Sequence, residues 1–309
     1  MTHPSIAGRD SAALGLAAVC WGLGTVISKA ALAEIPPLSL LTIQLASSVA
    51  VLALIMRRQG IPLRDDRHVL LGRLGLLNPG IAYSLSLLGL LTITASLSVV
   101  LWALEPLVIL VLAGAFLGER ITPGLVTLSL AAVVGMVFAV YEPSVGGGEF
   151  AGVALTLAGV ACCAAYTVIT RRFIPNAAET SQVVLSQQAH AVLLALVLIA
   201  LVALLGGQVV PTRLTPLGLA SAVGSGVLYY AGAYWFYLGA LRRVPASIAA
   251  PSFYLIPIVG LAGGAVLLGE RLAPSQWLGA AIVLGSVLAI VVRYSDRRAP
   301  EVGLRTSPG

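Results

Sequence analysis

The sequence predicts an all-α integral membrane protein, with ten transmembrane helices arranged as two inverted-topology repeats of five helices. Three observations lead to this prediction. Hydrophobic residues make up 59% of the 309 residues and charged residues only 10%, whereas soluble domains average roughly 25% charged residues. The apolar residues fall into runs of about 20, the length that a helix needs to cross a bilayer. One motif also recurs 151 residues further along the chain.

The apolar runs are separated by short segments that hold most of the charges. The first run is longer than the apolar part of a signal peptide and further runs follow it, so we expect it to be retained as a helix. The expected helices span residues 11–33, 38–57, 69–90, 95–117, 123–141, 150–171, 182–205, 214–240, 245–268 and 274–293.

Positive charges lie mainly on one side of the predicted bilayer. With a cytoplasmic N-terminus, fifteen arginines lie inside, and Lys29, Arg213 and Arg271 lie outside. Cytoplasmic loops of membrane proteins are enriched in this way. We therefore expect a multi-pass protein of the cell inner membrane, with cytoplasmic tails at residues 1–10 and 294–309. The net charge of +6 follows this distribution and does not indicate a nucleic-acid partner.

The chain contains an internal repeat. The segment FLGERITPGL at 116–125 aligns with LLGERLAPSQ at 267–276, an offset of 151. The same offset places Pro106 on Pro257 and Tyr83 on Tyr234. The repeats therefore occupy residues 11–141 and 150–293, with five helices in each.

An odd number of helices in each repeat means that the two repeats insert in opposite orientations, as in many secondary transporters. The two Gly-Glu-Arg motifs, 118–120 and 269–271, would then lie on opposite faces of the membrane. A motif that occurs on both faces is better explained by structure than by chemistry. We expect each one to form a tight turn that caps a helix end.

Lys29 is the only lysine of the chain, and it lies about one helical turn from the end of its span. Near the starts of the repeats, CWGLGTVISK (20–29) aligns with CCAAYTVITR (162–171) at an offset of 142, so Lys29 aligns with Arg171. Two readings stay open. The side chain extends to the membrane interface, or its ammonium group stands at the outer mouth of a substrate pathway.

These features together resemble the EamA family of the drug/metabolite transporter superfamily: two five-helix halves, CWG with a lysine in the first helix, and a proline followed by GER and a second proline in each half. The stretch Trp102-Ala-Leu-Glu105-Pro106 and the tyrosine-rich eighth helix are most similar to the aromatic amino-acid exporters. In the second helix, Gln44 stands where family members often carry an arginine. Any role of that arginine in binding anionic substrates is therefore open in this chain.

Aromatic residues are concentrated in the eighth and ninth helices. Tyr230, Tyr234 and Tyr237 recur at helical spacing on one face, with Phe253 nearby, and Tyr83 and Trp102 add rings from the first half. Such a set suits a substrate with an aromatic or apolar side chain and an ammonium group, through stacking and cation–π contacts. An interfacial aromatic belt or ordinary helix packing are the alternatives.

Glu105 is an acid near the middle of the predicted fourth helix. A carboxylate at this depth costs about 2.5–3.5 kcal/mol on insertion scales, so it should face protein or water. Its repeat partner is Ile256, whereas Pro106 is paired with Pro257. Because it has no counterpart, Glu105 is a candidate for binding a substrate ammonium or a coupling proton. It could instead bond to backbone groups near Pro106.

The remaining candidates are polar residues and prolines inside the spans. Gln44, Asn78 and Lys29 are included as cavity residues, and His190 is included although helix packing explains it well. Pro79, Pro106 and Pro257 are expected hinges, because proline interrupts a helix and frees carbonyl groups.

Other classes of function fit less well. A Walker A motif needs Gly-Lys-Ser/Thr, but the only lysine follows Ser28. A hydrolase would need an activated nucleophile, and Ser225 with His190 is the only pair to consider. Cys20, Cys162 and Cys163 all lie in spans and suggest neither a disulfide framework nor a metal site. We expect no enzyme activity, no cofactor and no metal.

The sequence thus predicts a monomeric secondary transporter that exports amino acids, aromatic and other neutral ones, by alternating access. A multidrug exporter of lipophilic cations is the alternative, because the same aromatic residues would serve it.

Overall fold

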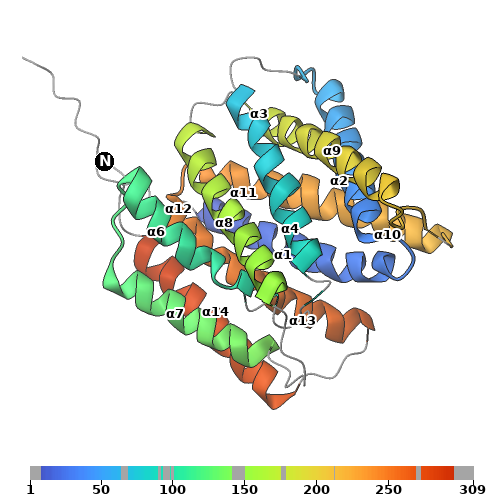
Figure 1. Ribbon diagram of the computed structural model, residues 1–309. Helices are drawn as coiled ribbons and strands as arrows, with labels where there is room; N and C mark the ends of the chain where they lie inside the picture. Colours follow the sequence, from blue (N-terminus) through green and yellow to red (C-terminus); the bar gives the residue numbers. More distant parts are fainter. Residues whose placement is uncertain are drawn as a thin grey trace, which may run out of the picture.

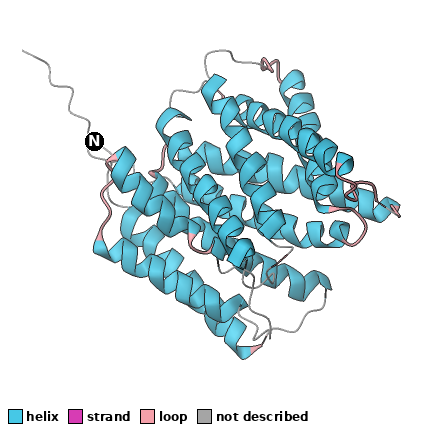
Figure 2. Ribbon diagram, viewed as in Figure 1, coloured by secondary structure: helices cyan, strands magenta, loops and turns pink. Residues whose placement is uncertain are grey.

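The computed structural model describes residues 8–63, 69–89, 92, 98, 101–140, 150–174, 179–211, 213–268 and 273–295. Helices form the whole architecture of this part of the chain, and no strand occurs in it (Figures 1 and 2). The α-helices are α1 (Gly8–Leu32), α2 (Pro37–Arg58), α3 (Val69–Gly75), α4 (Ala82–Gly89), α6 (Glu105–Leu117), α7 (Pro123–Val140), α8 (Phe150–Phe173), α9 (Thr180–Leu204), α10 (Pro216–Gly226), α11 (Ala233–Leu241), α12 (Ala246–Ala249), α13 (Leu255–Leu268) and α14 (Pro274–Ser295). Three further segments have other helical geometry: η2 (Leu76–Ile81) and η4 (Val227–Gly232) are π-helical, and η5 (Ala250–Tyr254) is a 3-10 helix.

Five of the described helices are long and apolar enough to cross a membrane by themselves: α1, α2, α8, α9 and α14. Shorter apolar helices also occur at Glu105–Leu117, Pro123–Ala139 and Ala246–Gly260. The protein is therefore a membrane protein with several apolar helices, as the composition predicts.

The predicted spans 69–90 and 214–240 are each interrupted by a π-helical segment. In the first, Pro79 has no N–H to donate, and Asn78 has the extended backbone angles φ −145° and ψ 123°. The second π-helical segment, η4, contains no proline, yet it begins at Val227, 151 residues after η2 begins at Leu76. The interruption thus follows the offset of the GER motifs, although the two sequences differ.

Polar and apolar residues are distributed in the manner of a protein in lipid. The outward side chains Val111, Val197 and Val292 are 70%, 64% and 63% exposed. Uncharged polar side chains lie inside, among them the fully buried Gln187 and Ser225. Lipid solvates the apolar exterior, whereas the interior polar groups need protein partners.

Helix pairing follows a regular pattern. Helix α2 packs on α9, and α7 packs along α14 (Figure 1). Helix α1 contacts α10, α11 and α13, whereas α8 contacts α3, α4 and α6. Each of these three contacts of α1 with the second half therefore has a counterpart in a contact of α8 with the first half.

Glycines allow several of these helices to approach closely. A Cβ added at Gly75 would lie 2.5 Å from the carbonyl carbon of Gln187, and one added at Gly226 would lie 2.5 Å from the Cα of Gln44. Gly226 follows Gly75 by 151 residues and Gln187 follows Gln44 by 143. Small residues at helix contacts are typical of membrane proteins, because they let backbones come together.

The first Gly-Glu-Arg motif forms a turn and caps a helix, as expected. Gly118 ends α6 with a positive φ of 67°, a conformation that glycine adopts without strain. The Glu119 carboxylate accepts hydrogen bonds from the backbone N–H groups of Ala246 and Ser247, both 2.9 Å, and from the Ser247 hydroxyl. It therefore caps α12 of the second half. The second motif, residues 269–271, lies outside the described residues.

Two further polar contacts join segments outside the spans. Arg243 donates to Asp10 at 2.6 and 2.9 Å, and this hydrogen bonding raises the pKa of Arg243. Glu34 accepts from the backbone N–H and the hydroxyl of Thr215, both at 2.7 Å. These two bonds hold the pKa of Glu34 below its usual range. Thr215 in turn caps α10 by accepting from Gly218.

Candidate functional site

Nine aromatic rings form one connected group, which we call the aromatic cluster. Its members come from both halves of the chain: Trp21, Tyr83, Trp102, Tyr166, Tyr229, Tyr230, Tyr234, Tyr237 and Phe253. Six of these residues are candidates from the sequence, namely Tyr83, Trp102, Tyr230, Tyr234, Tyr237 and Phe253.

Trp21 on α1 is the centre of one side of the aromatic cluster. Its ring centroid lies 5.5 Å from those of Tyr234, Tyr237 and Phe253 and 6.4 Å from that of Tyr229, always edge to face. Edge-to-face pairs at such distances are favourable. Trp21 is not among the site residues predicted from the sequence. Its place in the CWG motif is the signal that could have indicated it.

Tyr83 on α4 is the centre of the other side. It stacks on Trp102 with the centroids 5.8 Å apart and the planes at 18°, and its hydroxyl shares a hydrogen bond of 2.9 Å with that of Tyr229. Trp102 also donates from its indole nitrogen to Ser86 at 3.0 Å. Tyr83 and Trp102 are thus held at the junction between the two halves, beside the π-helical segment η4.

Buried amides complete the surroundings of the cluster. Asn78 accepts a hydrogen bond of 3.3 Å from Tyr234, and Gln187 accepts one of 2.8 Å from Tyr166. Gln187 also donates to the carbonyl of Leu71. Asn78 therefore contacts the cluster through Tyr234, and Gln187 contacts it through Tyr166.

Gln44 is buried between α1 and α10. Its amide nitrogen donates to Ser28 at 2.7 Å and to Ser225 at 2.9 Å. Ser225 donates to the carbonyl of Ala222, and His190 is bonded to the carbonyl of Ser186 on its own helix. Ser225 and His190 therefore do not form a hydrogen-bonded pair of nucleophile and base.

Glu105 is the first residue of α6, not a residue in the middle of a continuous helix. Its side chain is 7% exposed, and Oε1 has no hydrogen-bond partner. The Cys163 thiol of α8 is within hydrogen-bonding reach of the carboxyl group, and Tyr237 and Tyr254 lie close enough to interact with it electrostatically. The acid therefore lies beside the aromatic cluster.

The three expected hinges have different settings. Pro79 is inside η2, whereas Pro106 is in the first turn of α6, where a missing N–H costs nothing. Pro257 is the third residue of α13, directly after the 3-10 segment η5. His190 packs near Gly72 rather than near the rings. The side chain of Lys29 lies outside the described residues.

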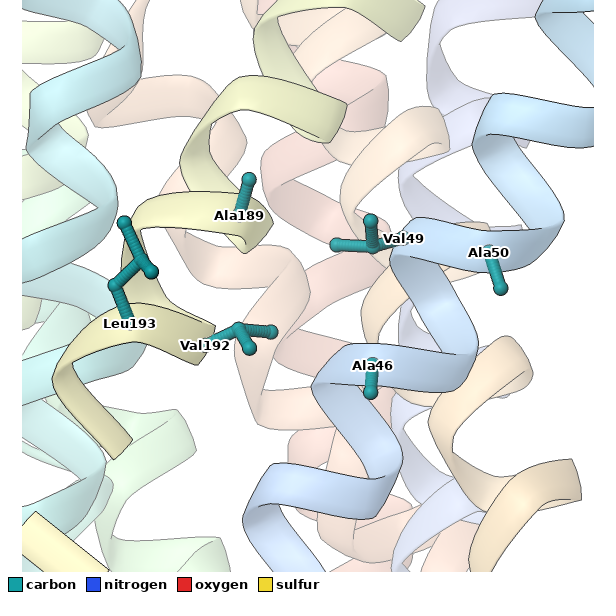
Figure 3. Close-up of a pocket in the computed structure, with 6 residues that line it drawn as sticks. All are labelled: Ala46, Val49, Ala50, Ala189, Val192 and Leu193. Carbon is teal, nitrogen blue, oxygen red and sulfur yellow. The ribbon is translucent and has the colours of Figure 1, made fainter. Parts of the chain in front are cut away.

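A cavity of about 330 Å³ lies elsewhere, between α2 and α9 (Figure 3). Its lining is wholly apolar and consists of Ala46, Val49, Ala50, Ala189, Val192 and Leu193. The three residues on α9 follow the three on α2 by 143 residues, the spacing that also relates Gln187 to Gln44. None of the candidate site residues lines this cavity.

The fold is that of a helical membrane protein with a buried aromatic cluster. Residues 12–141 and 150–292 match the EamA-like transporter family. The chain belongs to this family, and it is a membrane transporter.

Relatives of known sequence are named as transporters. An uncharacterized transporter of Archaeoglobus fulgidus is 25% identical over 283 residues, which cover 90% of this chain and 97% of that protein. The uncharacterized transporter YwfM of Bacillus subtilis is 28% identical over 153 residues, and this match spans about half of each chain. A solved crystal structure at 20% identity covers 92% of this chain and 99% of its own chain with a TM-score of 0.75, which shows that the fold is shared.

Proposed function

We propose that this transporter exports amino acids, aromatic and other neutral ones, across the cell inner membrane by alternating access. The observation that carries the proposal is the aromatic cluster, which joins rings from both halves beside a buried acid. Aromatic faces bind apolar side chains and ammonium groups. Glu105, Asn78 and the tyrosine hydroxyls supply the few polar contacts that such a site needs.

We also propose ten spans in two inverted repeats of five, with both termini cytoplasmic and a monomeric assembly. The matching contacts of α1 and α8 support the repeat, as do the two π-helical segments 151 residues apart. In this arrangement the substrate site lies near the bilayer midplane, between the repeats.

The rings are packed closely. Tyr230, Tyr234 and Tyr237 are 4%, 2% and 1% exposed and contact their neighbours directly. A substrate must separate them in order to bind. We therefore assign the structure to a state in which the site is closed around its own side chains.

Export of lipophilic cations is the second candidate function. One observation favours it: Glu105 lies next to aromatic faces and has no ion-pair partner among the described residues. Lipophilic cations would use the same rings and the same carboxylate.

The test is uptake of labelled phenylalanine, leucine and tetraphenylphosphonium into proteoliposomes, with and without a pH gradient. Uptake of the amino acids above that of empty liposomes supports the proposal. Uptake of tetraphenylphosphonium alone supports the second function, and uptake of none of the three contradicts both.

The inverted repeat has its own test in cysteine labelling of whole cells. A cysteine at Ser275 should react with an impermeant reagent from outside, whereas one at Gly124 should not. Labelling of both positions from the same side contradicts the inverted arrangement.

A further inference from the structure

The surroundings of Glu105 hold polar atoms that lack partners. Besides Oε1 of Glu105, the indole nitrogen of Trp21 and the hydroxyl of Tyr254 are buried without a hydrogen bond. Helix α6, which begins with Glu105, packs against α8 and against η5, the segment that ends at Tyr254. Trp21 contacts Tyr237 within the aromatic cluster. Buried polar groups are normally paired, because an unpaired one costs about 1–3 kcal/mol. The unpaired carboxyl oxygen of Glu105 is therefore a candidate site for a polar ligand.

The charge of Glu105 indicates what that ligand is. Within the part of the chain that the structure describes, no Lys, Arg or His pairs with this carboxyl group. A buried carboxylate without a partner is costly, so the group is stable only with a bound proton or a bound cation. The proton and the cation cannot occupy the same oxygen together.

We propose that Glu105 is an exchange site, at which a proton and the positively charged group of the transported molecule bind alternately. The inference rests on the proposed function, in which the charged group is the ammonium of an amino acid. In the exchange, the protonated carboxylic acid releases one proton and the resulting carboxylate binds one ammonium group. No other bond is made or broken.

The cation is organic rather than a metal ion. No group of three or more His, Cys, Asp or Glu side chains that could hold a metal occurs in the described ranges. The ring centroids of Trp21, Tyr237 and Phe253 lie 4.9–5.5 Å from one another. The faces of these rings instead offer cation–π contacts to an ammonium group.

The other titratable groups near Glu105 do not compete for this role. Cys163 faces it from α8, Tyr237 from α11, Tyr254 from η5 and Tyr229 from η4. Thiols and phenols are much weaker acids than a carboxylic acid, so they stay neutral where Glu105 changes its charge. Glu105 is then the one group that links proton binding to substrate binding at this site.

The experiment measures proton release from the purified full-length protein in weakly buffered detergent solution. L-phenylalanine is added in one series and tetraphenylphosphonium in another, and a pH indicator reports released protons. The wild type should release about one proton per bound ligand. Its apparent Kd should rise about tenfold for each unit by which the pH falls, across the range in which Glu105 takes up its proton.

Three variants separate the role of the acid from its structural effects. Glu105→Gln should release no proton, and its Kd should be independent of pH. Glu105→Asp keeps an acid and should still release protons. Glu179→Gln is the matched control, because Glu179 is an exposed glutamate at the start of α9 with no capping hydrogen bond, and it should behave as wild type.

The outcomes also distinguish this inference from the proposed function. Phenylalanine binding without proton release, or an unchanged pH dependence in folded Glu105→Gln, overturns the exchange site and leaves amino-acid export standing. Proton release with tetraphenylphosphonium alone supports the exchange site and contradicts amino-acid export. Folded wild-type protein that binds neither ligand overturns the exchange site as well.

Discussion

Gly226→Ala tests whether close contact between α2 and the helix α10–η4 stabilises the fold. The added Cβ would lie 2.5 Å from both the Cα and the carbonyl oxygen of Gln44, and closer still to the Ser47 hydroxyl. Carbon atoms in good contact are about 3.5–4.0 Å apart. The helices must therefore separate by about 1 Å at this point, and overpacking of this kind typically costs about 1–3 kcal/mol.

The cost should appear in thermal unfolding. The entropy of unfolding is about 2.1 cal/mol/K per residue, so 1 kcal/mol shifts the Tm of a 309-residue chain by about 1.5 °C, and we expect a fall of roughly 2–5 °C for Gly226→Ala. The measurement is loss of the folded peak in size-exclusion chromatography after heating in detergent. The hydrogen bond from Gln44 to Ser225, next to the substitution, should weaken as the helices separate.

Gly224→Ala is the matched control, two residues earlier on the same helix. Its Cβ would meet nothing within 4 Å. Because alanine is a better helix former than glycine by about 0.5–1 kcal/mol, the Tm should stay the same or rise. Equal Tm values for the two variants would refute the reasoning, because only Gly226 has a neighbour that must move.

Three further predictions concern the cap, an ionisable contact and the aromatic cluster. Glu119→Ala removes the acceptor of three hydrogen bonds at the start of α12 and should destabilise the protein by about 0.5–2 kcal/mol, measured as a lower Tm than in the exposed-site control Arg120→Ala. Because the pKa of Glu34 is depressed in the folded protein, its contact with Thr215 contributes above the unfolded-state pKa of about 4.3 and is lost as the pH falls through the folded value. The Tm of wild type should therefore fall relative to that of Glu34→Gln below about pH 4, and parallel pH profiles would contradict this sign. Trp102→Ala should lose transport in proteoliposomes while remaining folded, and undiminished uptake would mean that its stacking on Tyr83 only packs helices.

Hydropathy predicted the helical membrane architecture because lipid requires long apolar helices whatever their contacts. It could not predict where those helices are interrupted. Glu105 and Pro106 lie inside one apolar run, yet they begin a new helix in the structure. Hydropathy is the same on both sides of such a break, so the expected hinge at Pro106 was the one feature of the sequence that indicated it.

The sequence indicated the aromatic cluster where helical spacing or the repeat drew attention to a ring, as for Tyr234 and Tyr83. Trp21 and Tyr166 were missed because α1 and α8 are apolar on nearly all sides, so the sequence does not show which face is turned inward. His190 illustrates the same limit. Its rarity suggested a site, but its ring bonds to its own helix at Ser186.

In the proposed arrangement of two inverted repeats, the pairings α2–α9 and α7–α14 join equivalent helices, and their contacts map onto themselves when the repeats are interchanged. In a transport cycle in which the two repeats exchange conformations, such self-equivalent contacts have the same free energy in the inward-open and outward-open states. Substituting Val49 and Val192 together, which keeps the two positions equivalent, should then change how fast the protein cycles, but not which side it prefers to face. In the same proposed arrangement, the bond from Ser247 to Glu119 is different, because interchange of the repeats would move it to the opposite membrane face. A preference for one face would then be set by contacts that do not map onto themselves.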